Sequence, residues 1–312
     1  LLAYRGRRKG NRKRMVTIKR IEDLVYAALD GRPLLADLYL PQEPRGLVPV
    51  ILWLHGGGWR IGDRKLGPDL SRYFAERGYA MASIDYRLSG EAKFPAQIED
   101  VLAAIDWLRR SGAEYGIDAG RIGLWGSSAG GHLAALAGAQ RPADVRAVVD
   151  GYGPIDFLQM DDHRITAEQA EDDPESVRLH PGKRSADPDS PESQLLGAPI
   201  GEVPEKVRQA NPITYIQTGM PPYLILHGLS DLAVPSHQSE LLFEALATHG
   251  NDAALGLVPG LGHGFFNRNQ LGQDRALPMK VRHSSGKPPS WMPAGEPLLS
   301  FDFVEAFFRH YL

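Results

Sequence analysis

The stretch WGSSAGGHL, residues 125–133, decides the fold. It places two serines side by side between glycines, which raises the question whether either one is a nucleophile. Residues 126–130 fit the pattern G-x-S-x-G only with Ser128 at the centre. The pattern follows the apolar run RIGLW (121–125) and precedes a helical segment, so Ser128 stands at a sharp turn from strand to helix. We expect Ser127 to make a local hydrogen bond or to pack.

A glycine-rich loop supports catalysis over the simpler interpretation of 126–130 as a turn of small residues. G-x-S-x-G is frequent by chance, so it needs supporting features. HGGGW (55–59) directly follows the buried run VPVILWL (48–54). Consecutive glycines let backbone N–H groups approach a ligand without obstruction. This is the pattern of an oxyanion loop, whose donors act together with the N–H of the residue after the nucleophile, here Ala129.

An acid and a histidine follow two later strands. Asp231 lies in HGLSDLAVP after PYLIL (222–226), and His263 lies in GLGHGF after AALGLVP (253–259). Loops after parallel strands meet at one edge of a sheet, so Ser128, Asp231 and His263 are expected to come together. Their chain order is the one expected for α/β-hydrolases. The alternatives that we weighed are Asp150 and Asp156 for the acid, and His132, His227 and His249, for which structural roles are favoured.

Short apolar runs alternate with amphipathic segments from residue 34 to 151 and again after 220. The clearest helix spans 97–110, where apolar residues recur on one face. This alternation predicts an α/β fold with a mostly parallel central sheet and helices on both faces. The expected strands are 34–40, 48–54, 79–86, 121–125, 145–152, 222–228 and 253–259, and the expected helices are 68–77, 97–110, 129–140, 236–248 and 301–312.

Two segments interrupt the alternation. Residues 155–220 are rich in Pro, Asp and Glu and show no sustained period. Because strands and helices continue on both sides, we interpret them as a cap-like insertion after the sixth strand of a single domain, residues 15–312. Residues 267–297 are expected to form a long loop before the last helix. Residues 1–14 are interpreted as a basic N-terminal extension of upstream or artificial origin.

Composition and charge exclude several functional classes. Residues 1–14 hold seven of the 35 Lys and Arg and no acid, so the remaining 28 basic and 38 acidic residues give −10. A net negative charge of this size on residues 15–312 argues against nucleic-acid binding. The absence of cysteine excludes disulfides and thiol catalysis. No apolar run approaches the roughly 18 residues of a membrane span, and no signal peptide is recognisable, so a cytoplasmic protein is the default expectation.

Four motifs together resemble the hormone-sensitive-lipase-like branch of the α/β-hydrolases, and more closely the bacterial BD-FAE (acetyl-xylan and feruloyl esterase-like) esterases. They are HGGGW, GSSAGGH, DYRL (85–88) and the D-x-x-V of 231–234. The resemblance implies a serine carboxylesterase of short acyl or aryl esters, with Gly57, Gly58 and Ala129 forming the oxyanion hole. Cap helices usually precede the first strands in this branch, and here little room exists before residue 24, so a cap must come mainly from 155–220.

These groups predict an acyl-serine mechanism that needs no metal or organic cofactor. His263, held by Asp231, takes the proton of Ser128 as its Oγ attacks the ester carbonyl. The expected partner is a small-molecule ester, with acetyl or feruloyl esters of plant polysaccharide as candidates, and homo-oligomer formation is left open. Acidic pairs such as Asp161-Asp162 lack the ordered ligand spacing of a calcium site.

Two alternative functions remain open from the sequence. An arylformamidase of the kynurenine formamidase type shares a similar glycine loop and serine motif, and a comparison of formylkynurenine with aryl acetates separates the two. A catalytically silent hydrolase fold used as a binding module is a different class. Such proteins typically lose a member of the triad, whereas this chain keeps all three.

Overall fold

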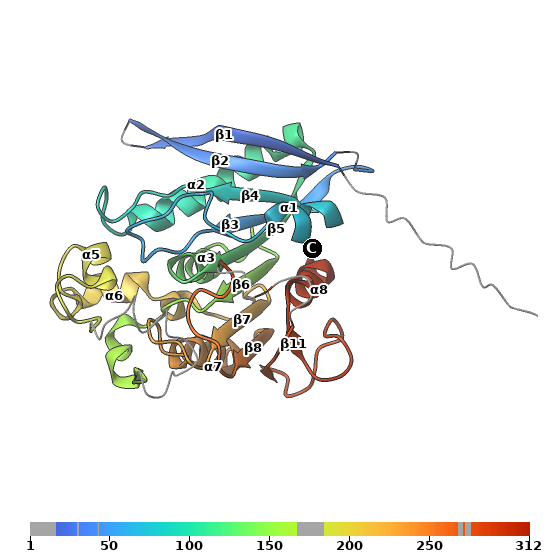
Figure 1. Cartoon of the computed structure of the whole chain (residues 1–312). Coiled ribbons are helices and arrows are strands. Elements are labelled where there is room, and N and C mark those ends of the chain that lie inside the picture. Colours follow the sequence, from blue (N-terminus) through green and yellow to red (C-terminus); the bar gives the residue numbers. More distant parts are fainter. Residues whose placement is uncertain (1–16, 30, 43, 167–183, 268–270, 272–275) are drawn as a thin grey trace, which may run out of the picture.

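A nine-stranded sheet forms the centre of the protein (Figure 1). The computed structural model describes residues 17–29, 31–42, 44–166, 184–267, 271 and 276–312. The strand order is β1-β2-β4-β3-β5-β6-β7-β8-β10. The bounds are β1 (Ile18–Leu29), β2 (Arg32–Pro41), β3 (Val48–Leu54), β4 (Ala80–Ile84), β5 (Ile117–Ser127), β6 (Ala147–Gly151), β7 (Tyr223–Gly228), β8 (Ala253–Val258) and β10 (Lys280–His283).

Most neighbouring strands in this sheet are parallel. The strands from β4 through β3 and β5 to β8 pair in parallel, whereas β1, β2 and β10 join antiparallel at the two edges. Parallel strands need crossover connections, and helices supply most of them here. The prediction of an α/β fold with a mostly parallel sheet is confirmed.

Helices cover both faces of the sheet. The helices α2 (Ala96–Ser111), α3 (Ala129–Gln140) and α7 (His237–Thr248) pack on one face, and α1 (Leu70–Tyr73) and α8 (Phe301–Tyr311) on the other. Strand β3 shows why two cores form, because its side chains alternate between the faces. Val50, Leu52 and Leu54 join the first core, and Ile51 and Trp53 the second.

The expected helix 68–77 is interrupted. The structure has a single helical turn, α1, and then a 3₁₀ turn, η1 (Ala75–Arg77). The Asp69 side chain caps the start of α1 by accepting a hydrogen bond from the Arg72 N–H. Gly78 ends η1 in the left-handed conformation.

The described parts of 155–220 contain only short helical elements. They are η3 (Phe157–Gln159), η4 (Asp161–His163), α5 (Pro191–Leu196), η6 (Ile200–Glu202), α6 (Pro204–Ala210) and η7 (Pro212–Tyr215). Proline stands at the start of α5, α6 and η7. Elements this short cannot show a helical period, which explains why the sequence pattern missed them.

The expectation of a loop over 267–297 needs correction. Its described part holds β10, which pairs antiparallel with β8 and extends the main sheet. It also holds β9 (Leu277–Pro278), which pairs with β11 (Leu298–Leu299).

Residues 1–14, interpreted above as an extension, lie outside the described residues. No helix in the described part of the chain is long and apolar enough to cross a membrane.

Candidate active site

Ser128 stands in a strained turn between β5 and α3. Its φ of 56° and ψ of −123° lie in a region that a residue with a side chain rarely adopts. The turn is so tight that both flanking positions require glycine. A Cβ on Gly126 would lie 2.0 Å from the Gly130 carbonyl oxygen, and one on Gly130 would lie 2.0 Å from the Leu54 carbonyl oxygen. The backbone therefore presents the Ser128 side chain beyond the end of the sheet.

The structure brings Ser128, Asp231 and His263 together. The Oγ of Ser128 lies 2.9 Å from Nε2 of His263, and Nδ1 of His263 lies 2.6 Å from Oδ2 of Asp231. These are hydrogen-bond distances, and they link the three side chains in the order that acyl transfer requires. His263 is 8% exposed and Asp231 2% exposed, so the charged acid is shielded from water.

Asp231 is held as a carboxylate by its surroundings. Its Oδ1 accepts hydrogen bonds from the backbone N–H groups of Ala233 and Val234 at 2.8 and 2.9 Å. Burial alone raises the pKa of Asp231, but the charge of His263 and the hydrogen bonds from His227 and His263 outweigh it. The pKa of Asp231 therefore lies well below its ordinary value, and the group is ionised at neutral pH.

The glycine loop 55–59 lies beside Ser128. Gly57 has φ 108°, and a Cβ there would lie 2.1 Å from the Ile61 carbonyl oxygen. The N–H groups of Gly57, Gly58 and Ala129 donate to no acceptor among the described residues. Unpaired donors beside a serine are what an oxyanion hole needs before substrate binds.

The DYRL segment anchors this loop. The Tyr86 hydroxyl donates a hydrogen bond to the His55 carbonyl at 2.9 Å, and the two rings stack with centroids 4.3 Å apart. The Ser89 N–H donates to the Trp59 carbonyl at 2.7 Å. Arg87 in turn is fixed by the buried carboxylate of Asp100. The DYRL segment thus fixes the His55 end of the oxyanion loop, and Ser89, the residue that follows the segment, fixes the Trp59 end.

Tyr152 is a residue at the site that the sequence did not indicate. It has φ 46° and is fully buried, and its ring centroid lies 4.9 Å from that of His263. Its hydroxyl accepts a hydrogen bond from the Phe266 N–H at 3.2 Å. It therefore supports the imidazole from the side. Nothing in VRAVVDGY signals this role, since the contact depends on a backbone angle.

Apart from His227, the residues considered as alternatives lie outside the hydrogen-bonded series Ser128, His263 and Asp231. Ser127 is buried and accepts a hydrogen bond from Asn267. His132 donates to the Ala210 carbonyl, His249 contacts the Ala245 carbonyl at the end of α7, and Asp156 caps η3. Nε2 of His227 lies 3.2 Å from Oδ2 of Asp231. Asp150 is fully buried and accepts a hydrogen bond from the Gly153 N–H.

The burial of Asp150 predicts a pH-dependent stability. Burial raises the pKa of Asp150 to about 6, although the nearby His227 and the Gly153 hydrogen bond oppose it. Because the folded pKa exceeds the unfolded one, its contribution is present below about pH 4 and is lost as pH rises through about 6. We expect wild type to lose about 3 kcal/mol of unfolding free energy relative to Asp150→Asn between pH 4 and 7. Denaturant unfolding of both proteins measures this, and a pH-independent difference would contradict it.

The described parts of the insertion contact two loops of the site. A Cβ on Gly58 would lie 3.3 Å from the Cβ of Pro191, the first residue of α5. Arg164 donates hydrogen bonds to the Leu232 and Ala233 carbonyls, directly after Asp231. The helices α5 and α6 lie on the other side of the molecule from α8 in Figure 1.

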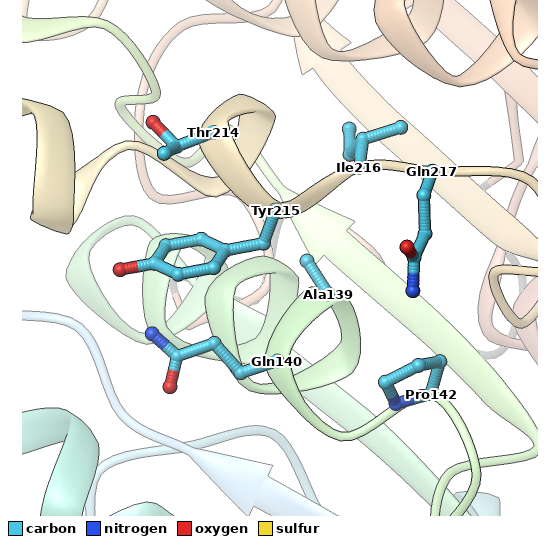
Figure 2. A pocket seen from close by; sticks show the side chains of 7 residues that line it. All are labelled: Ala139, Gln140, Pro142, Thr214, Tyr215, Ile216 and Gln217. Atoms are coloured by element: carbon cyan, nitrogen blue, oxygen red, sulfur yellow. The ribbon is translucent and has the colours of Figure 1, made fainter.

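A shallow pocket of about 560 Å³ lies away from this site (Figure 2). It is formed by the C-terminal end of α3 and by η7, whereas Ser128 precedes the first residue of α3. Its lining residues are Ala139, Gln140, Pro142, Thr214, Tyr215, Ile216 and Gln217. The pocket therefore does not hold the group that reacts with Ser128.

A serine on a strand-to-helix turn, with its histidine and acid on later loops of a mostly parallel sheet, defines the α/β-hydrolase class. The family model of BD-FAE matches residues 36–246, more than half of the chain, and the chain belongs to this family. That match contains Ser128 and Asp231 and ends before His263. The assignment of His263 to the site therefore rests on the distances of its two ring nitrogens from Ser128 and Asp231.

Related proteins are named as esterases. Esterase LipC of Mycobacterium tuberculosis is 33% identical over 241 residues, which cover 72% of this chain and 54% of LipC. A truncated carbohydrate esterase from gut microbiota has 29% identity and a TM-score of 0.68, over 82% of this chain and 93% of that one. A bifunctional GH43-CE protein of Bacteroides eggerthii has 31% identity and a TM-score of 0.66, over 80% and 34%. The chain spans about half the length of the curated relatives it matches.

Proposed function

We propose that the protein is a carboxylic ester hydrolase that works through an acyl-serine on Ser128. The observation that carries the proposal is the continuous hydrogen-bonded series Ser128, His263 and Asp231 beside the glycine loop. The names of its relatives, LipC and the gut carbohydrate esterase among them, support the same reaction class.

The mechanism follows from the positions of the groups. Nδ1 of His263 donates to the ionised Asp231, so Nε2 is the basic nitrogen and accepts the Ser128 proton as Oγ attacks the carbonyl carbon. The negative charge that develops on the carbonyl oxygen is bound by N–H groups of Gly57, Gly58 and Ala129. The protonated His263 then gives its proton to the leaving alcohol. Water repeats the steps on the acyl-serine and releases the acid.

The oxyanion loop gives a direct test of this mechanism. In Gly57→Ala the new Cβ would collide with the Ile61 carbonyl and would disfavour φ 108°, so the donor must move. We expect kcat to fall about 10²- to 10³-fold, as is typical for the loss of one oxyanion donor. The control is Gly90→Ala, where nothing lies within 4 Å of the new Cβ. Equal activity of the two variants would contradict the assignment.

We propose that residues 155–220 form a cap on the acyl side of the site, within a single domain that spans 15–312. The position of Pro191, 3.3 Å from where a Cβ on Gly58 would lie, and the hydrogen bonds of Arg164 to the 232–233 backbone support this arrangement. A cap so close to the oxyanion loop favours small acyl groups. Esters of carbohydrate are the proposed natural class, by similarity to the gut carbohydrate esterase. Acetyl esters fit a small acyl site, and the bulkier feruloyl esters are the alternative that methyl ferulate tests.

This cap predicts a preference for short acyl chains. We expect kcat/KM for p-nitrophenyl esters to be highest from acetyl to about hexanoyl, because each misfit methylene costs about 1–3 kcal/mol. Steady-state rates on acetate, butyrate, octanoate and palmitate measure the profile, with methyl ferulate added for aryl esters. A maximum at palmitate would contradict the small pocket. Turnover of formylkynurenine without turnover of any ester would favour the amidase instead.

A further inference from the structure

We propose that His227 is a positioning residue for the reaction, which holds the Asp231 carboxylate in the orientation that His263 needs. We infer further that Ser239 fixes the tautomer in which His227 does so. The inference rests on the proposed function, because it assigns a role relative to that site. His227 does not touch the reacting atoms.

The contacts of His227 determine where its proton lies. His227 is fully buried near the end of β7, and its Nε2 lies 3.2 Å from Oδ2 of Asp231 and 3.0 Å from the Val234 carbonyl oxygen. Both atoms are acceptors at neutral pH, so Nε2 must carry a proton and donate it. Its Nδ1 lies 2.6 Å from Oγ of Ser239, which is buried on α7.

A neutral imidazole with a proton on Nε2 has an accepting Nδ1. The Ser239 hydroxyl therefore donates to Nδ1 and stabilises this tautomer over the alternative. A directed series of donors results, from Ser239 to His227 and from His227 to Asp231. It begins on α7 and reaches the catalytic carboxylate at Oδ2, the oxygen that also contacts His263.

Asp231 is held on both of its oxygens. Oδ1 accepts the N–H groups of Ala233 and Val234, Oδ2 accepts Nδ1 of His263, and Nε2 of His227 lies 3.2 Å from Oδ2 with its one proton between Oδ2 and the Val234 carbonyl. A carboxylate has about four acceptor positions, so three accept hydrogen bonds and the fourth faces the shared proton of His227. Rotation of the group would break several of these hydrogen bonds at once. His227 thus fixes the plane of the carboxylate against which His263 is aligned.

His227 also shares the negative charge of Asp231. The buried Asp150 of β6 also interacts with His227, and the Tyr152 ring lies 6.5 Å from the His227 ring. Without the His227 hydrogen bond, more of the Asp231 charge would act on His263 and favour its protonated form. The acidic limb of kcat/KM should then move to higher pH. A residue with only a packing role would not produce this movement.

The test compares His227→Leu and His227→Gln with a matched control, Tyr223→Phe. Tyr223 lies on the same strand and donates a buried hydrogen bond to the Ala135 carbonyl, away from the site. We expect His227→Leu to lower kcat about 10- to 100-fold, as is typical for an outer-shell partner, with little change in KM and a shifted acidic limb. His227→Gln keeps an N–H donor and should recover much of the rate. Tyr223→Phe should lower Tm without changing kcat or the limb.

Each remaining outcome supports or overturns the proposal. A folded His227→Leu that behaves like Tyr223→Phe overturns it. If His227→Leu does not fold, Ser239→Ala takes its place. We expect Ser239→Ala to lower kcat by a smaller factor and to move the acidic limb of kcat/KM to higher pH as well. An unchanged pH profile of Ser239→Ala overturns the proposal. If wild type hydrolyses no ester, the proposed function fails. His227 is then judged by proton NMR, in which the deshielded resonance of the His263 Nδ1 proton must shift in the variant.

Discussion

Ser128→Ala is expected to lower kcat for p-nitrophenyl acetate by about 10⁴-fold or more, because it removes the nucleophile of the proposed acyl intermediate. A residual rate should remain, since the oxyanion donors still bind the carbonyl oxygen. Steady-state hydrolysis measures the loss, and circular dichroism checks that the variant is folded. Tm should change little, because the one side-chain hydrogen bond of Ser128 among the described residues is that with His263.

Ser127→Ala is the matched control for this variant. Ser127 is the adjacent residue, is buried, and accepts a hydrogen bond from the Asn267 amide at 3.2 Å. Its loss should cost some stability and leave kcat within a few-fold of wild type. If Ser127→Ala were inactive and Ser128→Ala active, the nucleophile would be wrongly assigned. If both were fully active, the hydrolysis would not use this turn at all.

Asp231→Asn is expected to have the second large effect, about 10⁴-fold in kcat. An amide N–H₂ at the position of Oδ2 cannot accept from Nδ1 of His263, so the imidazole takes the tautomer with its proton on Nε2. That nitrogen can no longer accept the proton of Ser128. The measurement is kcat at neutral pH, where the lowered pKa of Asp231 keeps the wild-type group charged.

Asp156→Asn is the control, because Asp156 was an alternative for the acid in the sequence and lies outside the hydrogen-bonded series. Its side chain caps η3 by accepting from the Leu158 N–H. We expect its kcat to stay close to wild type. Inactivity of Asp156→Asn together with activity of Asp231→Asn would exchange the two assignments.

The core of the fold and the meeting of Ser128, Asp231 and His263 could be predicted from the sequence for the same reason. Strand β3 and helix α3 have the expected bounds, 48–54 and 129–140, because each is delimited by glycine or by a change in hydrophobic pattern. Ser128, Asp231 and His263 each follow a buried strand. In a parallel sheet that position alone brings side chains to one edge.

What the sequence did not predict depends on contacts between distant segments. Strand β10 is a four-residue edge strand, KVRH, and no local sequence pattern predicts its pairing with β8. The role of Tyr152 depends on a positive φ, and that of His227 on the return of α7 to the end of β7. A buried histidine beside glycine looks the same in sequence whether it packs or positions an acid.

The central claim is that Ser128 forms a covalent acyl intermediate. The most direct measurement is intact-protein and peptide mass spectrometry after rapid mixing with p-nitrophenyl acetate and acid quenching, on wild type and on Ser128→Ala. We predict one acetyl group on the peptide that contains Ser128 in wild type and none in the variant. A wild-type enzyme that turns over the ester without labelling this peptide, or a variant that is labelled equally, would contradict the account.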